Sequence, residues 1–350
     1  MFYSLYVLNV KKETSNSVSI EFEIPQTLSS EFSFKAGQFV TVRKQINNEE
    51  IRRSYSICST PESGKIKLVV KQIPNGKFST YAVQELKIGD IIDVTKPSGD
   101  FFLNPQPKNE KSYTLIAAGS GITPIISILK TILIQEPNST VNLFYGNKSP
   151  ELTIFKKEIE TLNQKYSEKL NVHFIYSQTK GKSRFHNGRL EGRKIKKIFK
   201  KLAPINLTDN VFICGPQDMT TTIKNLLENT LNFDASCIHY ELFISNKVDK
   251  KQKSKNKKGS SIATAILNGE TFEFVIKKNE SILEAGLAAG YDIPFSCQGG
   301  VCGVCKCLIG EGEIEMENNI ALSDDEVESG TALSCQAKVL SPIIIIDFDN

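Results

Sequence analysis

The segment "PFSCQGGVCGVCKCLIGEGE", residues 294–313, places four cysteines within eleven positions, with three glycines among the residues between them. Cys297, Cys302 and Cys305 are separated by four and two residues, and the first cysteine beyond Cys307 is Cys335. Thiolates are soft ligands, and closely spaced cysteines on one loop can bind the same metal ion or cluster. This spacing therefore predicts a metal centre.

Two kinds of metal centre use closely spaced cysteines, and the gaps distinguish them. A zinc ribbon pairs two CxxC knuckles, whereas a plant-type [2Fe-2S] centre uses CX4CX2C followed by one distant cysteine. The loop glycines suit the second reading, because backbone without Cβ atoms can turn N–H groups toward negatively charged sulfides. We therefore predict a [2Fe-2S] cluster and expect Cys307 to be a packed thiol on the next strand. The predicted ligands are Cys297, Cys302, Cys305 and Cys335.

Residues 262–350 around this loop predict a small α+β domain of the β-grasp type. "SIATAILNGETFEFVI", beginning at Ser261, has two alternating strands about an Asn268-Gly269 turn, the strongest short-range hairpin signal. Ser281 and Glu284 have the spacing of a capping box for the next helix, which Gly290 ends. The cluster loop and a final strand complete the predicted domain.

A lysine-rich linker, residues 246–261, precedes this domain. "NKVDKKQKSKNKKGSS" contains seven lysines, and Val248 is its only apolar side chain. Such a segment cannot bury surface and repels itself, so we expect an extended tether.

The net charge of +4 conceals a division between two parts of the chain. Residues 260–350 carry 15 acidic and 4 basic side chains, net −11, which leaves 39 basic and 24 acidic side chains, net +15, in residues 1–259. Opposite charges suggest that the two parts attract each other or a charged partner, or that each surface is merely solubilising. The basic part lacks a recognisable DNA or RNA motif, so we do not expect a nucleic-acid partner.

Residues 109–245 alternate strand and helix, as in a doubly wound α/β domain. "YTLIAAG", starting at Tyr113, predicts a central parallel strand, and "GSGITPIISILKTIL" predicts a glycine turn opening into a helix. We expect Thr123 to cap this helix, Pro124 to take its first position, and the N–H groups of residues 119–123 to seat a diphosphate. A later helix is expected to start at Ser149-Pro150. The turn differs from GxGxxG because Pro124 stands at the third glycine position.

Residues 1–108 contain short alternating strands separated by turn residues, which predicts an antiparallel β-barrel. Within it, "RRSYSI" places Arg53 and Tyr55 on one face of a strand and Ser56 on the other. An arginine suits phosphate, a tyrosine ring suits a flat aromatic ligand, and a serine hydroxyl suits a ring nitrogen. Taken alone, the stretch also fits an ordinary strand.

Taken together and in this order, "RSYS", "GKFS" (76–79), "GSGITP" (119–124) and "CGP" (214–216) resemble the ferredoxin-NADP reductase superfamily. A flavin barrel, a pyridine-nucleotide domain and a C-terminal plant-type ferredoxin domain are the arrangement of reductase components of multicomponent oxygenases. Softer strings such as "AGQFVTV", "FYGN", "LSCQA" and "DFD" are similar to the reductase subunits of phenylacetyl-CoA epoxidases. The resemblance runs over nearly the whole chain.

The resemblance implies a role for each matching residue. On the flavin side, Arg53 would bind the flavin phosphate, Tyr55 would face the isoalloxazine and Ser56 its N5 edge. The flavin diphosphate would be held by Gly76, Lys77, Phe78 and Ser79. The nicotinamide dinucleotide would be held by Gly119, Gly121, Thr123 and Pro124 at its diphosphate and by Cys214, Gly215 and Pro216 beside the nicotinamide. Glu241 and Phe243 would close the site near the flavin, or simply end a strand, and Ser56, Cys214 and Glu241 would act in hydride transfer.

The loop after the third predicted strand bears on nucleotide choice. "SQTKGKSR" offers Ser177, Lys180, Lys182 and Arg184, with no acid before Glu191. Hydroxyls and cations suit a 2′-phosphate, so NADPH is expected, although a solvated basic loop has the same composition. FAD is expected over FMN from the resemblance, and FMN remains open.

These parts together imply electron transfer. A nicotinamide gives two electrons as a hydride, a cluster accepts one at a time, and a flavin can connect the two. No hydrolytic site is visible, so oxygen chemistry would belong to a partner oxygenase. Alternatives are another acceptor, such as a ring hydroxylase, desaturase, ferredoxin or flavodoxin, and a non-catalytic redox carrier or sensor.

The sequence also bears on location. It has no apolar run of membrane-spanning length and its start lacks a cleavable signal pattern, so no membrane insertion is expected. Eight cysteines without an export signal favour a reducing compartment, and we expect the cytoplasm.

Overall fold

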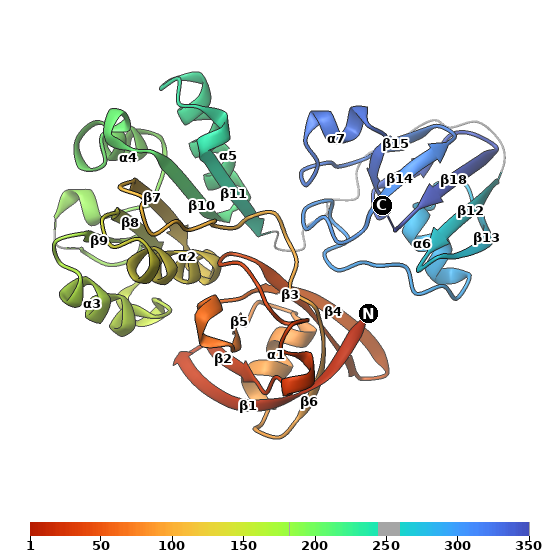
Figure 1. The fold of residues 1–350 in the computed structure, drawn as a ribbon, viewed down its shortest axis with the longest axis horizontal. Coiled ribbons are helices and arrows are strands. Elements are labelled where there is room, and N and C mark those ends of the chain that lie inside the picture. The colour runs from red at the N-terminus through yellow and green to blue at the C-terminus, as the bar shows by residue number, and fades with distance from the viewer. Residues whose placement is uncertain (182, 244–259, 350) are drawn as a thin grey trace. The chain divides into compact units, whose positions relative to one another are not determined.

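The computed structural model describes residues 1–181, 183–243 and 260–349. These form two compact units, Met1–Phe243 and Ile244–Asn350, which are described separately below (Figure 1). Most of the predicted tether and Lys182 lie outside the described residues. Among the described residues, no helix has the length and apolar character needed to cross a membrane.

The first part of unit 1 is the predicted antiparallel barrel. Its strands are β1 (Phe2–Thr14), β2 (Ser17–Phe22), β3 (Phe39–Ile46), β4 (Glu49–Ser56), β5 (Ile66–Lys71) and β6 (Ile91–Thr95). They pair in the order β4-β3-β6-β1-β2-β5, and a bridge between Ile57 and Leu68 joins the two end strands. Alternate side chains such as Leu5, Ile20 and Leu68 are almost fully buried and form the barrel core with Phe78 of helix α1 (Lys77–Gln84). The expected barrel is confirmed.

The second part of unit 1 is a parallel sheet with helices on its faces. Its strands are β7 (Ser112–Ala118), β8 (Thr140–Asn147), β9 (Leu170–Tyr176), β10 (Asn210–Pro216) and β11 (Ile238–Phe243), in the order β11-β10-β7-β8-β9. Its helices are α2 (Ile122–Gln135), α3 (Lys156–Lys165), α4 (Gly192–Lys197) and α5 (Gln217–Asn229). Every pairing is parallel, so the carboxyl ends of all five strands meet at one edge. The expected doubly wound fold is confirmed.

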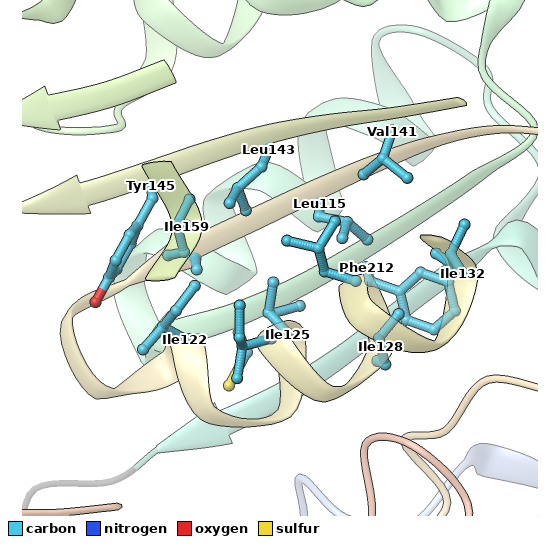
Figure 2. Packing of buried hydrophobic residues seen from close by; sticks show 14 of the residues in the cluster. Leu115, Ile122, Ile125, Ile128, Ile132, Val141, Leu143, Tyr145, Ile159 and Phe212 are labelled. Atoms are coloured by element: carbon cyan, nitrogen blue, oxygen red, sulfur yellow. The ribbon is translucent and has the colours of Figure 1, made fainter. Parts of the chain in front are cut away.

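Helix α2 is the element that fixes the glycine turn. Nearly all its side chains are buried, and Figure 2 shows Ile122, Ile125 and Ile128 facing Leu115 and Leu143 of the sheet. Burying one such side chain is worth about 1.5–3 kcal/mol. The start of α2 is thereby anchored against the carboxyl end of β7.

Two expected helix starts are wrong in detail. Helix α2 begins at Ile122 with Gly121 as its cap, because a 3-10 turn over Gly119–Gly121 leads straight into it. Thr123 does not cap; it lies inside the helix, and its hydroxyl donates to the Ser120 carbonyl of the preceding 3-10 turn at 3.0 Å. Ser149-Pro150 opens only a 3-10 turn, and α3 starts at Lys156 after Phe155 adopts a left-handed φ of 59°.

Unit 2 has the expected β-grasp arrangement. The main sheet runs β13-β12-β18-β14-β16, and β15 pairs with β17 in a second small sheet. The strands are β12 (Ser261–Leu267), β13 (Glu270–Ile276), β14 (Lys306–Glu311), β15 (Ile314–Met316), β16 (Thr331–Leu333), β17 (Ala337–Val339) and β18 (Ile343–Asp347), with helices α6 (Ile282–Ala288) and α7 (Asp324–Glu328). Both halves of the Ser281–Glu284 capping box are present at the start of α6. Asn268 and Gly269 both have positive φ, as the hairpin turn requires.

Candidate redox sites

The end of strand β4 brings Tyr55 and Ser56 to the boundary between barrel and nucleotide domain. Ser56 is 3% exposed, and its Oγ donates to Oε2 of Glu241 at 2.9 Å. The Tyr55 ring lies 5.6 Å from that of Phe78, and burial raises the pKa of its hydroxyl. Arg53, on the same strand, donates from Nη1 to the carbonyl of Arg52 at 2.6 Å. The strand thus presents a ring and a buried hydroxyl close together in sequence and space.

Glu241 and Cys214 lie side by side because β10 and β11 pair them in register. Oε2 of Glu241 lies 3.9 Å from Sγ of Cys214, which is fully buried. Burial raises the pKa of Glu241 to about 7, against the lowering effect of hydrogen bonds from Ser56 and Cys214. Burial, followed by the nearby Glu241, raises the pKa of the Cys214 thiol, which therefore stays protonated. Near neutral pH, Glu241 can both hold and release a proton.

The turn after β7 approaches β10 very closely. A Cβ atom on Gly121 would lie 2.2 Å from the Cys214 carbonyl oxygen, so only glycine fits there. Gly119 has a φ of +56°, and the Tyr145 hydroxyl donates to its carbonyl at 2.9 Å. Figure 2 shows this hydroxyl at the end of α2 that begins at Ile122. The close contact with β10 on one side and the Tyr145 hydrogen bond on the other hold the turn in one conformation.

The remaining predicted nucleotide residues differ in what they can offer a ligand. Thr123 and Pro124 are buried inside the first turn of α2, so they shape the turn from within. Gly215 is also buried, and a Cβ atom there would lie 2.7 Å from Cε of Met219. Pro216 is exposed at the end of β10, where it pairs in register with Phe243 of β11.

The "GKFS" motif forms the start of α1. Gly76 caps the helix, and the Ser79 hydroxyl, 5% exposed, accepts from the Ile73 N–H at 3.3 Å. Phe78 is 2% exposed in the barrel core, so it can offer a ligand only backbone atoms. Lys77 is exposed and forms an ion pair with Glu49. The free N–H groups at a helix start suit a phosphate.

Two lysines that were not predicted as site residues lie close to each other, and one of them, Lys71, lies beside the Gly119 turn. A Cβ atom on Gly119 would be 3.8 Å from Nζ of Lys71, the last residue of β5. Burial, and then the nearby Lys148, lower the pKa of Lys71. Lys148 directly follows β8, at the carboxyl edge where doubly wound sheets bind ligands. Lys148 could have been predicted from the sequence, because it directly follows the "FYGN" motif. Lys71 could not, because only the fold brings it to the Gly119 turn.

The predicted 2′-phosphate residues lie on one loop after β9. Ser177, Lys180 and Arg184 are all exposed, and the Ser177 N–H donates to the Asn147 carbonyl at 2.9 Å. The Gly188 N–H donates to the Tyr176 carbonyl at 2.7 Å, which closes the loop at its base. The loop therefore gathers its described cations at one edge of the sheet.

In unit 2, the four predicted ligand cysteines come together as two pairs. Sγ of Cys305 and Cys335 lie 3.2 Å apart, and the Gly299 N–H donates to Sγ of Cys297 at 3.3 Å. A hydrogen bond from the Cys302 thiol, then backbone N–H groups, lower the pKa of Cys297 to about 5 despite burial. The pKa of Cys335 is also lowered, first by the Cys305 thiol. The hydrogen bond within each pair raises the pKa of the other thiol, Cys302 or Cys305, so one thiol of each pair is stabilised as the thiolate and its partner keeps its proton. Cysteines bind iron as thiolates.

Cys307 does not join these pairs. It is fully buried on β14, its Sγ lies 3.7 Å from the Ala332 carbonyl, and burial raises its pKa to about 12. Glycine at 300 is needed because a Cβ atom there would lie 2.4 Å from the Asn318 carbonyl oxygen. The donor set thus fits a four-thiolate [2Fe-2S] cluster.

Three stretches of the chain match known domain families. Residues 5–103 match an oxidoreductase FAD-binding domain, residues 115–225 an oxidoreductase NAD-binding domain, and residues 265–340 a 2Fe-2S iron-sulfur cluster binding domain. The chain is 37% identical to a subunit of the 1,2-phenylacetyl-CoA epoxidase of Escherichia coli (strain K12), over 99% of this chain and 98% of that one. The chain belongs to the reductase components of multicomponent oxygenases. The reductase is also 30% identical to the ferredoxin reductase component of 3-ketosteroid-9-alpha-monooxygenase of Rhodococcus rhodochrous, over 98% and 96% of the two chains.

A solved structure aligns with almost the whole chain. Phthalate dioxygenase reductase, described as a modular structure for electron transfer from pyridine nucleotides to [2Fe-2S], aligns with a TM-score of 0.62 and 25% identity. The alignment covers 99% of this reductase and 98% of that chain. The order of flavin, nucleotide and cluster domains makes the reductase an enzyme that moves electrons from a pyridine nucleotide to an oxygenase.

Proposed function

We propose that the reductase oxidises NADPH at FAD and delivers the electrons, one at a time, through a [2Fe-2S] cluster to an oxygenase of the phenylacetyl-CoA epoxidase type. The observation that carries this proposal is the Ser56–Glu241 hydrogen bond of 2.9 Å. It joins the barrel strand that bears the flavin motif to the last strand of the nucleotide domain. A flavin there, when bound, supplies the chemistry that converts a two-electron donor into a one-electron source.

The residues of unit 1 would bind and orient the two nucleotides. Tyr55 would stack on the flavin ring, Arg53 and the N–H groups of residues 76–79 would bind its phosphates, and FAD is preferred to FMN because residues 5–103 match an FAD-binding domain. The Gly119–Gly121 turn, flanked by Lys71 and Lys148, would bind the diphosphate of the pyridine nucleotide.

A proton path is the main chemical contribution of the protein itself. Ser56 Oγ and Glu241 Oε2 are in hydrogen-bond contact, and the pKa of Glu241 is about 7. The pair can therefore accept a proton at Ser56 and hold it on Glu241 near neutral pH. The buried neutral thiol of Cys214 packs beside them and would keep water from the nicotinamide position.

The two thiol pairs would bind the cluster. Cys297 with Cys302 and Cys305 with Cys335 would hold it, because the thiols of each pair already lie close in space. The cluster, when bound, supplies a one-electron relay.

NADPH is proposed over NADH because of the loop after β9. Its described cations, Lys180 and Arg184, are exposed beside Ser177 at the carboxyl edge of the sheet. Guanidinium and ammonium groups bind phosphate through charge-assisted hydrogen bonds. Lys182, outside the described residues, belongs to the same proposal.

We further propose the boundaries 1–108, 109–245 and 262–350 for the flavin, nucleotide and cluster domains, with 246–261 as linker. The cytoplasm is the proposed location, because all eight cysteines are unpaired by disulfides and the cluster thiolates need a reducing environment.

The acceptor is tested by reconstitution. NADPH oxidation by the loaded reductase should become coupled to oxygenation of phenylacetyl-CoA when the oxygenase subunits of a phenylacetyl-CoA epoxidase are added. A 3-ketosteroid-9-alpha-monooxygenase oxygenase component serves as the comparison. Better coupling to the ketosteroid enzyme would reject the proposed acceptor. Failure to oxidise NADPH even with ferricyanide would reject the proposed function as a whole.

A further inference from the structure

The cluster loop is braced by a second segment, residues 318–326, which includes the start of α7. The Asn318 side-chain amide donates to the Gly299 carbonyl at 2.8 Å. The N–H groups of Ile320 and Ala321 both donate to the Gly300 carbonyl, at 3.0 and 3.1 Å. The brace therefore holds the part of the loop between Cys297 and Cys302.

An ion pair joins the other end of the loop to the same segment. Nζ of Lys306, the residue after Cys305, lies 2.7 Å from Oε1 of Glu326 on α7. The stem of Lys306 passes over the loop, because a Cβ atom on Gly303 would lie 3.1 Å from its Cε. Gly303 stands between Cys302 and Cys305, so this ammonium group is held at the ligand loop.

Glu326 is fixed from both sides. Its Oε2 accepts from the Ser323 N–H at 2.8 Å, and its own N–H donates to the Ser323 hydroxyl at 3.2 Å. This is a complete capping box at the start of α7. One carboxylate oxygen is thus committed to the helix and the other to Lys306, so the lysine has a defined position. Both side chains are partly shielded from water, at 27% and 37% exposure.

We propose that Lys306, positioned by Glu326, raises the reduction potential of the cluster. Residues 260–350 carry 15 acidic side chains and only 4 basic ones, so the surrounding field opposes the addition of an electron. A cation at the ligand loop stabilises the reduced cluster, and the Glu326 carboxylate partly offsets it. Charge and hydrogen bonding near the sulfurs are established determinants of cluster potentials. The inference rests on the proposed four-cysteine ligand set.

The test is a spectroelectrochemical titration of the cluster in the full chain loaded with flavin and cluster. Lys306→Met is expected to lower the equilibrium constant for reduction about tenfold, which is 59 mV for a one-electron couple. Glu326→Gln is expected to raise it about threefold, because it removes the negative charge that offsets Lys306 while its one amide oxygen can still accept from the Lys306 ammonium group. Lys306→Arg, which keeps the charge, should stay close to the original value.

Lys277→Met is the matched control. Lys277 is 76% exposed, pairs with Glu280, and follows the end of β13 that is paired with Ser261. The Lys277→Met substitution removes the same charge from the same domain. Its shift in the reduction potential of the cluster should be less than a third of the shift in Lys306→Met. Equal shifts for the two lysines, or an unchanged or lower potential in Glu326→Gln, would overturn the proposal.

Iron and labile-sulfide content separates this inference from the ligand assignment. If the variants keep their normal iron and labile-sulfide content but their reduction potentials do not change, the proposed role of Lys306 is rejected and the four-cysteine ligand set is not. If Lys306→Met loses its cluster, Glu326→Gln decides the question, because that substitution leaves every residue of the ligand loop in place.

Discussion

Replacing Glu241 with glutamine is expected to remove a pH dependence from electron delivery to the cluster. Burial raises the pKa of Glu241 to about 7. A carboxyl group with this pKa is about 9% ionised at pH 6 and about 91% ionised at pH 8. Flavin re-oxidation releases a proton, and the Ser56 hydroxyl, 2.9 Å from Oε2, can pass it to an ionised Glu241. The step should therefore quicken about tenfold from pH 6 to pH 8.

The assay is anaerobic stopped-flow absorbance of flavin-to-cluster transfer across this pH range. Glu241→Gln keeps an acceptor for Ser56 but cannot titrate, so its profile should be flat. Ser56→Ala retains the carboxylate and loses the relay, so its rate should be low at every pH. If the transfer rate of Glu241→Gln still changes with pH around pH 7, Glu241 is not the group that causes the pH dependence, and another group would then be responsible.

The same pKa has a consequence for stability, with a definite sign. The folded-state pKa of Glu241 lies above its usual value of 4.5, so folding favours the protonated form. This contribution is fully present below about pH 4.5 and is lost as the pH rises to about 7. Between these values the thermal midpoint should fall less with pH in Glu241→Gln than in the original protein.

Three further predictions concern the cluster, the nucleotide and the charge division. Cys302→Ser should lose the cluster and keep the flavin, whereas Cys307→Ser should keep both; iron and sulfide assays would contradict this if Cys302→Ser retained full iron. Alanine at both Lys180 and Arg184 should raise KM for NADPH far more than KM for NADH, each lost contact being worth about 1.5–3 kcal/mol; equal losses would assign them to folding. With net −11 in residues 260–350 and net +15 in residues 1–259, flavin-to-cluster transfer should slow as salt rises while hydride transfer changes little. A flat or faster transfer would instead assign the acidic surface to the oxygenase.

The hairpin, the first helix and the grouping of the cysteines in the cluster domain could be predicted because most of their signals are local. The gaps between Cys297, Cys302 and Cys305 depend only on chain order, and the structure brings these thiols into two pairs with Cys335. The Ser281 capping box is equally local, since its two partners lie three residues apart. Such features depend on neighbouring residues and not on how the rest of the chain folds.

The errors arose where neighbouring turns decide the geometry. Thr123 is a residue type that often caps helices, but the 3-10 turn before it makes the helix begin one residue earlier, at Ile122. Ser149-Pro150 is a good start signal that Phe155 overrides by adopting a left-handed conformation. Local preference competes with such tertiary constraints and often loses.

The site residues that escaped prediction are those assembled from distant segments. Lys71 ends a barrel strand and Lys148 follows a strand of the nucleotide domain, yet Lys148 lies close enough to Lys71 to help lower its pKa. The Ser56–Glu241 contact spans 185 positions in the sequence. Resemblance named both of those residues, but only the fold gives the hydrogen bond between them.

Anaerobic mixing of the loaded reductase with NADPH shows whether electrons pass from NADPH to flavin and then to the cluster. Flavin absorbance should bleach first and cluster absorbance afterwards, at a rate no faster than flavin reduction. A chain ending at Asn246, which lacks the cluster domain, should show only the first phase. Cluster reduction that precedes flavin bleaching, or that persists when the flavin is removed, would show that the flavin does not pass electrons to the cluster.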